Sequence, residues 1–519
     1  MVMNMLYAVK NNQKRKKIVL SVTYFSFLIS GIMLVHTAFS QEKEKLVPKL
    51  EEVLPDMDTL SGTGGWTNSV SRSAITPEDM KRIEADNNPL LPTTEHLFGS
   101  WGGVRTWLYK HGLSFSLDDK NEFAGNITGG VRKGATNAGA VDANLDVDWS
   151  TLVGKNWVTD GLVSHMTVIG RYGNDIGKTT GENINQVQEI YGASGNVAAK
   201  LIQLYTDKRF LNSRIVWTFG RMAVGAHYAS SPLHCNFMNN GICGNPKALV
   251  GQVGGFNAWP DSSWGTNLMV RPIPKVYVRV GLYQVSRAAY GNAAGHRAGW
   301  AGLVKTSRDA GGEIPIEVGF EPKWGKDELP GHYKFGFAYD TSPYQVWGKD
   351  IYGGHVATSG QPQKWHRGRD TEWVMLDQMI LRNGPSDASG LIGLVGWIHS
   401  NPLTFQRKDE IIAGLINTGF WKSRPQDAIG LLFIHQTMSG KLKRAQRYYL
   451  SQTGLSGGFP GGALRPGLQT AEDTFELTYI IRLYEGVRFQ PDFQYEIHPN
   501  AQKNINDAAF LGFKSQVEF

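Results

Sequence analysis

The chain has few cysteines and, beyond residue 40, no long apolar run. Cys235 and Cys243 are the only two cysteines among 519 residues, and neither they nor the histidines show the spacing of a zinc site, so no metal is expected. In an exported chain such a pair is expected to form a disulfide that closes a small loop. No segment after residue 40 offers the eighteen or more consecutive apolar residues of a membrane helix.

The first 40 residues are typical of a secretory signal. Lys10 and a basic run at 14–17 precede an apolar stretch at 18–35, and the small residues at 38–40 precede a polar segment. An uncleaved inner-membrane anchor is the alternative. Residues 1–40 contain no acidic side chain, so most of the formal charge of +7 belongs to the signal. The nearly neutral remainder predicts no nucleic-acid partner.

The remainder divides into two parts. Residues 41–96 contain charges and several prolines with little periodicity, which predicts a flexible periplasmic segment, with a short helix near 76–85. Residues 97–519 are expected to form one domain. It opens with a short helix at 101–112, closed by Gly112.

The end of the chain alternates strictly between apolar and polar residues. In the segment 487–497 the apolar series from Val487 to Ile497 alternates with a polar series from Arg488 to Glu496, and 509–519 repeats the pattern. A strand places successive side chains on opposite faces, so one face is apolar and the other polar. Repeated around a closed sheet, this pattern is that of a transmembrane β-barrel.

Sixteen segments qualify as strands. They are 114–122, 143–150, 164–172, 198–207, 213–222, 266–271, 275–285, 315–322, 333–340, 371–381, 391–399, 411–419, 428–438, 474–483, 487–497 and 509–519. Most of the gaps after odd-numbered segments are long and those after even-numbered ones short, as expected for outer loops and periplasmic turns. We therefore predict an all-β, antiparallel barrel of about 16 strands. A barrel of this size leaves an aqueous channel.

Two features do not fit simple alternation. Segments 391–398 and 411–416 are apolar on both faces, which periodicity alone cannot distinguish from a buried strand or helix. Arg221 shares the parity of Trp217 and Phe219. Either a bulge shifts the register there, or Arg221 lies beyond the lipid band.

The polar series predicts residues that line water. Charged and amide groups can exchange hydrogen bonds with the hydroxyl groups of a solute, and tryptophans of the outer loops can stack on sugar rings. For each such residue, simple solvation of the channel or interfacial anchoring is the alternative. The candidates are Asp118, Lys120, Glu122, Arg171, Arg221, Arg279, Arg488, Gln490, Asp492, Gln494, Trp259 and Trp264.

One motif suggests catalysis, and we reject it. Residues 454–458 match the G-x-S-x-G pattern of hydrolases, with Ser456 as nucleophile. That motif requires a helix after the serine, whereas Pro460 and neighbouring glycines follow here. We predict no catalytic residue and no cofactor.

The order of several short motifs resembles the carbohydrate-selective porin (OprB) family over residues 97–519. The resemblance rests on Leu97-Phe98-Gly99-Ser100-Trp101-Gly102-Gly103-Val104-Arg105, Glu122, Asn126, Gly220-Arg221-Met222, Cys235-Asn236-Phe237, Cys243-Gly244-Asn245-Pro246, Trp259-Pro260, Trp264-Gly265, Val280-Gly281-Leu282-Tyr283, Arg424-Pro425-Gln426-Asp427 and Gln490-Pro491-Asp492-Phe493-Gln494-Tyr495.

The resemblance implies a sixteen-stranded barrel in the bacterial outer membrane that lets glucose and similar small sugars diffuse passively into the periplasm. It also implies outer loops that fold inward, with Glu122 and Arg221 near the constriction and the loop pinned by Cys235 and Cys243 forming part of it. The expected partners are outer-membrane lipids, small carbohydrates and the barrel assembly machinery acting on Phe519; a homotrimer is left open. The alternatives are a general or anion-preferring small-solute porin and a structural outer-membrane barrel.

Overall fold

The structure is a computed structural model that describes residues 96–191, 196–250, 255–286, 309–384, 389–453 and 467–519. The chain divides into two units, Met1–Leu54 and Pro55–Phe519, and every described residue belongs to the second. The predicted signal at 1–40, the helix at 76–85 and the rejected Ser456 motif therefore lie outside the described residues.

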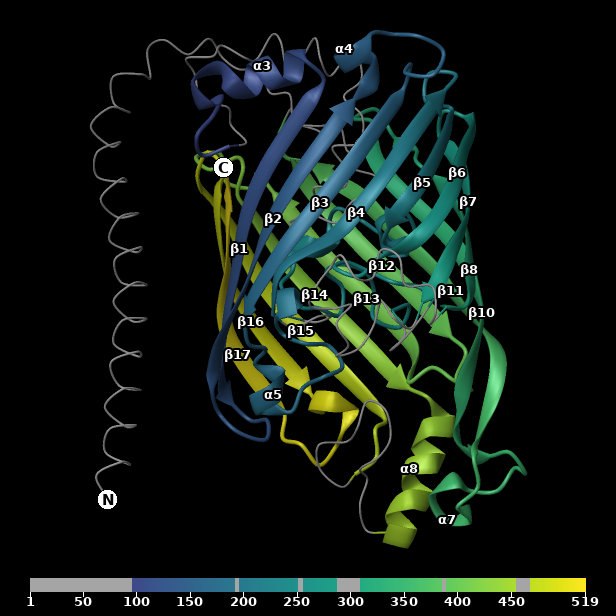
Figure 1. Ribbon diagram of the computed structural model, residues 1–519. Helices are drawn as coiled ribbons and strands as arrows, with labels where there is room; N and C mark the ends of the chain where they lie inside the picture. Colours follow the sequence, from purple (N-terminus) through teal and green to yellow (C-terminus); the bar gives the residue numbers. More distant parts are fainter. Residues whose placement is uncertain (1–95, 192–195, 251–254, 287–308, 385–388, 454–466) are drawn as a thin grey trace, which may run out of the picture. The chain divides into compact units, whose positions relative to one another are not determined.

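Sixteen antiparallel strands form one closed sheet (Figure 1), as the alternation predicts. Each strand pairs with its neighbours in the chain, and β1 pairs with β17 to close the ring. The two-residue β9, Lys323–Trp324, pairs only with the start of β10. The strands are β1 Leu113–Thr128, β2 Ala135–Asp148, β3 Leu162–Gly173, β4 Val197–Phe210, β5 Ile215–Met222, β6 Ser263–Ile273, β7 Val276–Ser286, β8 Asp309–Phe320, β10 Leu329–Asp350, β11 Gln363–Arg382, β12 Gly390–Ser400, β13 Arg407–Thr418, β14 Ala428–Met438, β15 Ala471–Tyr484, β16 Val487–Ile497 and β17 Ala508–Glu518.

The helices are short; the α-helices lie at the two ends of the barrel, whereas the 3₁₀ turns η5 and η6 lie in the segment between β5 and β6. At the end that holds the C-terminus lie α3 and α4; at the opposite end lie α5, α7 and α8 (Figure 1). None of the described helices is long and apolar enough to span a membrane. Their bounds are η3 Trp101–Gly103, α3 Val104–Lys110, α4 Trp149–Val153, α5 Gly177–Thr180, η4 Glu189–Tyr191, η5 Val224–Ala226, η6 His234–Asn236, α7 Val356–Ser359, α8 Gly440–Thr453 and η7 Pro499–Ala501.

The predicted loop lengths are wrong in two places. The loop expected at 123–142 is mostly strand, because β1 continues to Thr128 and β2 begins at Ala135. The loop expected at 341–370 is likewise shortened by the long strands β10 and β11. Small and glycine residues in β2 and Pro343 in β10 conceal the alternation, although the ladder pairing continues through both regions.

The strands that are apolar on both faces line a part of the interior that protein fills. Ile392 and Leu394 of β12 and Ile412 and Ile416 of β13 point inward and are at most 3% exposed. They belong to a core cluster that includes Phe237 and other residues between β5 and β6. These segments are thus buried core strands, one of the two interpretations that the pattern left open.

The predicted bulge at Arg221 is wrong, because the pairing of β5 with β4 and β6 continues without a shift from Ile215 through Arg221. Trp217 and Phe219 are exposed on the outer face of β5, whereas Arg221 and Met222 are both buried. The alternation changes at Gly220, whose φ is +135°. A Cβ at this position would lie 2.5 Å from the carbonyl oxygen of Leu204, so only glycine fits.

Candidate permeation path

The long segment between β5 and β6 folds into the barrel. The described residues of this segment, 223–250 and 255–262, are called the inward loop, and a disulfide joins its Cys235 to Cys243. Phe237 packs at the inner wall, where a Cβ on Gly430 of β14 would lie 2.9 Å from its ring. Because apolar side chains of the loop cover apolar side chains of β11 to β14, this side of the interior is closed to water.

Carboxylates around the wall fix the inward loop by accepting backbone hydrogen bonds. Glu476 of β15 accepts from Met238 N at 2.5 Å and from Asn239 N at 3.1 Å. Glu410 of β13 accepts from Ala248 N at 2.7 Å, and Glu317 of β8 accepts from Ala229 N at 2.8 Å. Bonds to charged acceptors are the stronger ones, and these come from three separate parts of the wall. The loop is therefore anchored across the barrel rather than along one strand.

A second loop between β3 and β4, described over residues 174–191, covers the opposite wall. Ile190 N donates to Glu122 Oε2 at 3.0 Å, and Gln188 Nε2 donates to the backbone oxygen of Glu122 at 2.8 Å. The second loop also meets the inward loop, because Glu189 N donates to Met238 O at 3.1 Å. Together the two loops narrow the interior from both sides.

Charged groups gather where the loops meet the wall of β1 to β3. Lys514 Nζ lies 3.3 Å from Glu122 Oε1 and 3.4 Å from Glu189 Oε1. Arg171 interacts electrostatically with both carboxylates. Burial opposes charge on Glu189, but the neighbouring cations hold the pKa of its carboxyl below its usual range. The cluster thus keeps paired charges of both signs next to the loops.

Further predicted residues face inward and already have protein partners. Lys120 forms a buried ion pair with Asp142, and Asp118 accepts from Asn144 Nδ2 at 3.4 Å. Several of the others hold the inward loop. Gln490 donates to Asn236 O at 2.9 Å, Gln494 accepts from Asn239 Nδ2 at 2.8 Å and donates to Asp492 at 2.8 Å, and Arg279 donates to His227 O. Arg488 is half-buried on the inner face of β16.

The two predicted tryptophans have different positions. Trp259 lies in the inward loop and packs against two core clusters. Trp264 was predicted to lie in an outer loop, which is wrong. It belongs to β6, pairs with Arg221 of β5, and is 39% exposed on the outer face together with Leu268. Strand β6 begins earlier than its apolar residues indicate, so Trp264 faces away from the interior.

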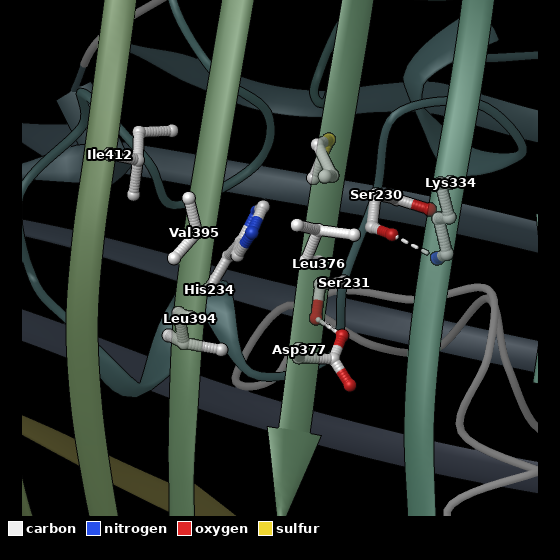
Figure 2. A pocket seen from close by; sticks show the side chains of 10 residues that line it. Ser230, Ser231, His234, Lys334, Leu376, Asp377, Leu394, Val395 and Ile412 are labelled. Carbon is white, nitrogen blue, oxygen red and sulfur yellow. Dashed lines mark hydrogen bonds between the residues drawn. The ribbon is translucent and has the colours of Figure 1, made fainter. Parts of the chain in front are cut away.

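The inward loop also encloses a small cavity against β10 to β13 (Figure 2). There Ser231 donates to Asp377 at 3.3 Å and Lys334 donates to Ser230 O at 2.5 Å. Burial, reinforced by Lys334, lowers the pKa of His234 to about 3, so this imidazole is neutral. The residues that line the cavity are Ser230, Ser231, His234, Lys334, Met375, Leu376, Asp377, Leu394, Val395 and Ile412.

Sequence reasoning missed the anchors Glu317, Glu410 and Glu476 as a set. No local pattern shows that the backbone partner of Glu476 lies more than 200 residues away. The signal that could have identified Glu410 is an acidic residue on the inward face of β13, directly before the apolar residues 411–413.

Comparison with known proteins identifies the family. The model of the family described as "Carbohydrate-selective porin, OprB family" matches residues 132–519. The chain belongs to this family. It is 26% identical over 444 residues to Porin B of Pseudomonas aeruginosa, covering 82% of this chain and 92% of that protein. It is 25% identical over 442 residues to the putative porin QuiX of Acinetobacter baylyi, covering 82% and 93%.

The fold agrees with this assignment. The high-pH structure of OprB from Pseudomonas putida superposes with a TM-score of 0.73 at 24% identity, covering 82% of this chain and 99% of that chain. The protein is therefore a carbohydrate-selective porin of the bacterial outer membrane, and both its family and its fold are those of a passive diffusion channel. The resemblance drawn from the sequence is confirmed.

Proposed function

We propose that glucose and similar small sugars cross between the two loops, past Arg171, Glu189, Arg407 and Glu410. The observation that carries this proposal is the division of the interior. The inward loop seals the apolar wall, while charges of both signs collect where it faces the second loop. Such groups exchange hydrogen bonds with hydroxyls without binding a neutral solute tightly, which suits passage. Glu122, Asp118, Lys120, Arg221, Arg279 and the polar residues of β16 position this path.

Liposome swelling with the purified protein tests the path. Glucose should enter faster than glucosamine, which has nearly the same size but carries a positive charge. Replacing Arg171 with Leu should reduce that preference, because the leucine donates no hydrogen bonds. Lys441→Gln on the exposed face of α8 is the matched control and should change nothing. Equal entry of both solutes into wild-type liposomes would instead indicate a general pore.

Self-association is proposed from the outer face of β1. Asp119 and Asn121 share the outward parity of Phe115 and Phe123. The hydroxyl of Tyr172 lies 3.5 Å from Asp119 Oδ1 and accepts from Asn121 at 3.4 Å. A carboxylate that faces lipid is costly, so we infer that another copy of the chain covers this face, as in a homotrimer.

Light scattering in detergent tests the assembly. Asp119→Leu should shift the protein toward monomer, because it replaces the polar group that favours a protein neighbour with one that lipid accepts. Asp327→Leu in the exposed turn between β9 and β10 removes a carboxylate outside the outer face of the strands and is the control. If the wild-type protein is monomeric, or if both variants behave alike, the proposed interface is wrong.

The C-terminal residue is proposed as the point of recognition by the barrel assembly machinery. In the closed barrel Phe519 N donates to Leu117 O at 2.9 Å, and Arg105 of α3 donates to Phe519 O at 2.5 Å. We infer that the machinery binds Phe519 before these contacts form. Phe519→Ala should lower the amount of protein in the outer membrane but not its refolding in detergent.

The same proposal includes cleavage after residue 40, a periplasmic segment at 41–96 and no catalytic residue.

A further inference from the structure

Lys247 stands on a rigid turn of the inward loop. The disulfide closes the preceding segment, and Asn245 Nδ2 donates to the backbone oxygens of Gly225, Tyr228 and Ala229 at 3.1, 3.2 and 2.8 Å. Lys247 N donates to Gly241 O at 3.2 Å, and the next amide is held by Glu410. The backbone on both sides of this lysine is therefore fixed before any solute arrives.

The ammonium group of Lys247 differs from those of the other lysines inside the barrel in having no hydrogen-bond or ion-pair partner among the residues that the structure describes. Lys120 pairs with Asp142, Lys200 with Asp261 at 2.6 Å, and Lys514 with Glu122 at 3.3 Å. Lys334 donates to a backbone oxygen. Lys247 is half-buried, and its ammonium has no hydrogen bond or ion pair to any residue in the described part of the chain. An interior cation in this condition is costly unless water or a solute contacts it.

The surroundings place the ammonium between opposite walls. It interacts electrostatically with Arg407 and Glu410 of β13, Arg171 of β3 and Glu189 of the second loop. Strands β3 and β13 are not neighbours in the sheet, so the charged groups that act on this ammonium come from separate parts of the wall and from the second loop. Glu410 already holds Ala248 N, Glu189 is engaged by Lys514, and Arg407 donates to Asn183 O and Ile184 O at 3.2 and 3.1 Å. Both carboxylates that act on this ammonium are therefore already engaged by other groups.

We propose that Lys247 is a subsite for the carboxylate of small polyhydroxylated acids, so that the channel passes sugar acids as well as neutral sugars. The proposal rests on the proposed passage between the two loops. The ammonium would pair with the carboxylate while Arg171 and the neighbouring polar groups exchange hydrogen bonds with the hydroxyls. A single partly hydrated ion pair is weak, so the acid is released again, as conduction requires.

The zero-current potential of single porins in planar bilayers, in a gradient of potassium gluconate, measures the permeability of the acid relative to potassium. Lys247→Gln should lower the gluconate-to-potassium ratio by about fivefold, the order expected for removing one charge from a narrow polar path. Lys247→Arg should retain the wild-type ratio. Lys441→Gln removes the same charge from the exposed surface of α8 and should also retain it.

The pH dependence separates a direct role from a structural one. Burial and the neighbouring Arg407 lower the pKa of Lys247 to about 8, so the wild-type ratio should fall between pH 7 and 9.5. Lys247→Gln and Lys247→Arg should lack this fall, which assigns it to Lys247 rather than to Glu189 or Glu410. An unchanged ratio in Lys247→Gln, or the same fall in Lys247→Arg, would overturn the subsite. Failure of wild-type liposomes to prefer glucose over glucosamine overturns the proposed passage instead.

Discussion

Removal of the disulfide should loosen the inward loop without unfolding the barrel. The bond links residues eight positions apart, and closing a loop of that length removes about 2.5 kcal/mol of chain entropy from its open state. That free energy corresponds to about a 70-fold change in the ratio of closed to open loop. The strand ladder does not involve either cysteine, so the barrel itself should keep its thermal stability.

Hydrogen exchange measures this change directly. The amides of Met238, Asn239 and Ala248 are bonded to wall carboxylates, so they exchange only when the loop leaves the wall. In Cys235→Ala/Cys243→Ala their protection should fall by up to about 70-fold, since the wall contacts remain and only the entropic restraint is lost. The amides of β12 should be unaffected and serve as the internal control. Unchanged protection in the loop would show that the wall contacts alone hold it, and the reasoning about the disulfide would be refuted.

Three further predictions concern separate contacts. Phe237→Ala should reduce the free energy that holds the inward loop against the wall by about 3–5 kcal/mol. Proteolysis of residues 223–250 should therefore increase. Phe475→Ala on the outer face should leave that proteolysis unchanged. Gly220→Ala should disrupt β5 next to Arg221, because the added Cβ would meet the backbone of β4; circular dichroism of the refolded barrel and its melting temperature would report the loss. Burial raises the pKa of Asp175 to about 6, above its value of 3.8 in the unfolded chain. The protonated carboxyl therefore contributes fully to the stability of the second loop below pH 3.8. That contribution is lost as the pH rises through 6. Hydrogen exchange of residues 175–186, corrected for intrinsic rates, should therefore show falling protection between pH 4 and 7, and Asp175→Asn should remove the trend.

The strands were predictable because lipid and water impose a local pattern on them. Most of the sixteen segments were recognised from alternation, and the closing strand β17 shows it clearly from Leu511 to Val517. Alternation fails where the side chains are small, as from Ala138 to Ala140 in β2. There the backbone hydrogen bonds to the neighbouring strand extend β2, and these bonds leave no pattern in the sequence. Trp264 was misplaced for the same reason.

The interior was less predictable because its contacts join distant residues. The polarity of Gln490 and Gln494 correctly indicates the inner face, but not that both bond to the inward loop. Likewise Lys247 lies in a loop without periodicity, and only the fold places it between Arg171 and Glu410. Family resemblance indicated that loops fold inward, whereas the identity of their anchors required the structure.

The inward loop also determines which part of the wall can face water. Ile392, Leu394, Ile412 and Ile434 point into the barrel from β12, β13 and β14, and each is at most 3% exposed because the loop covers it. Exposing a buried side chain of this kind costs about 1.5–3 kcal/mol, so uncovering all four would be expensive relative to the stability of a typical domain. A variant without the loop should consequently lose stability or admit detergent and lipid to this wall, rather than become a wider aqueous pore. The loop is a component of the channel wall, and selectivity is better tested by single substitutions along the path than by its deletion.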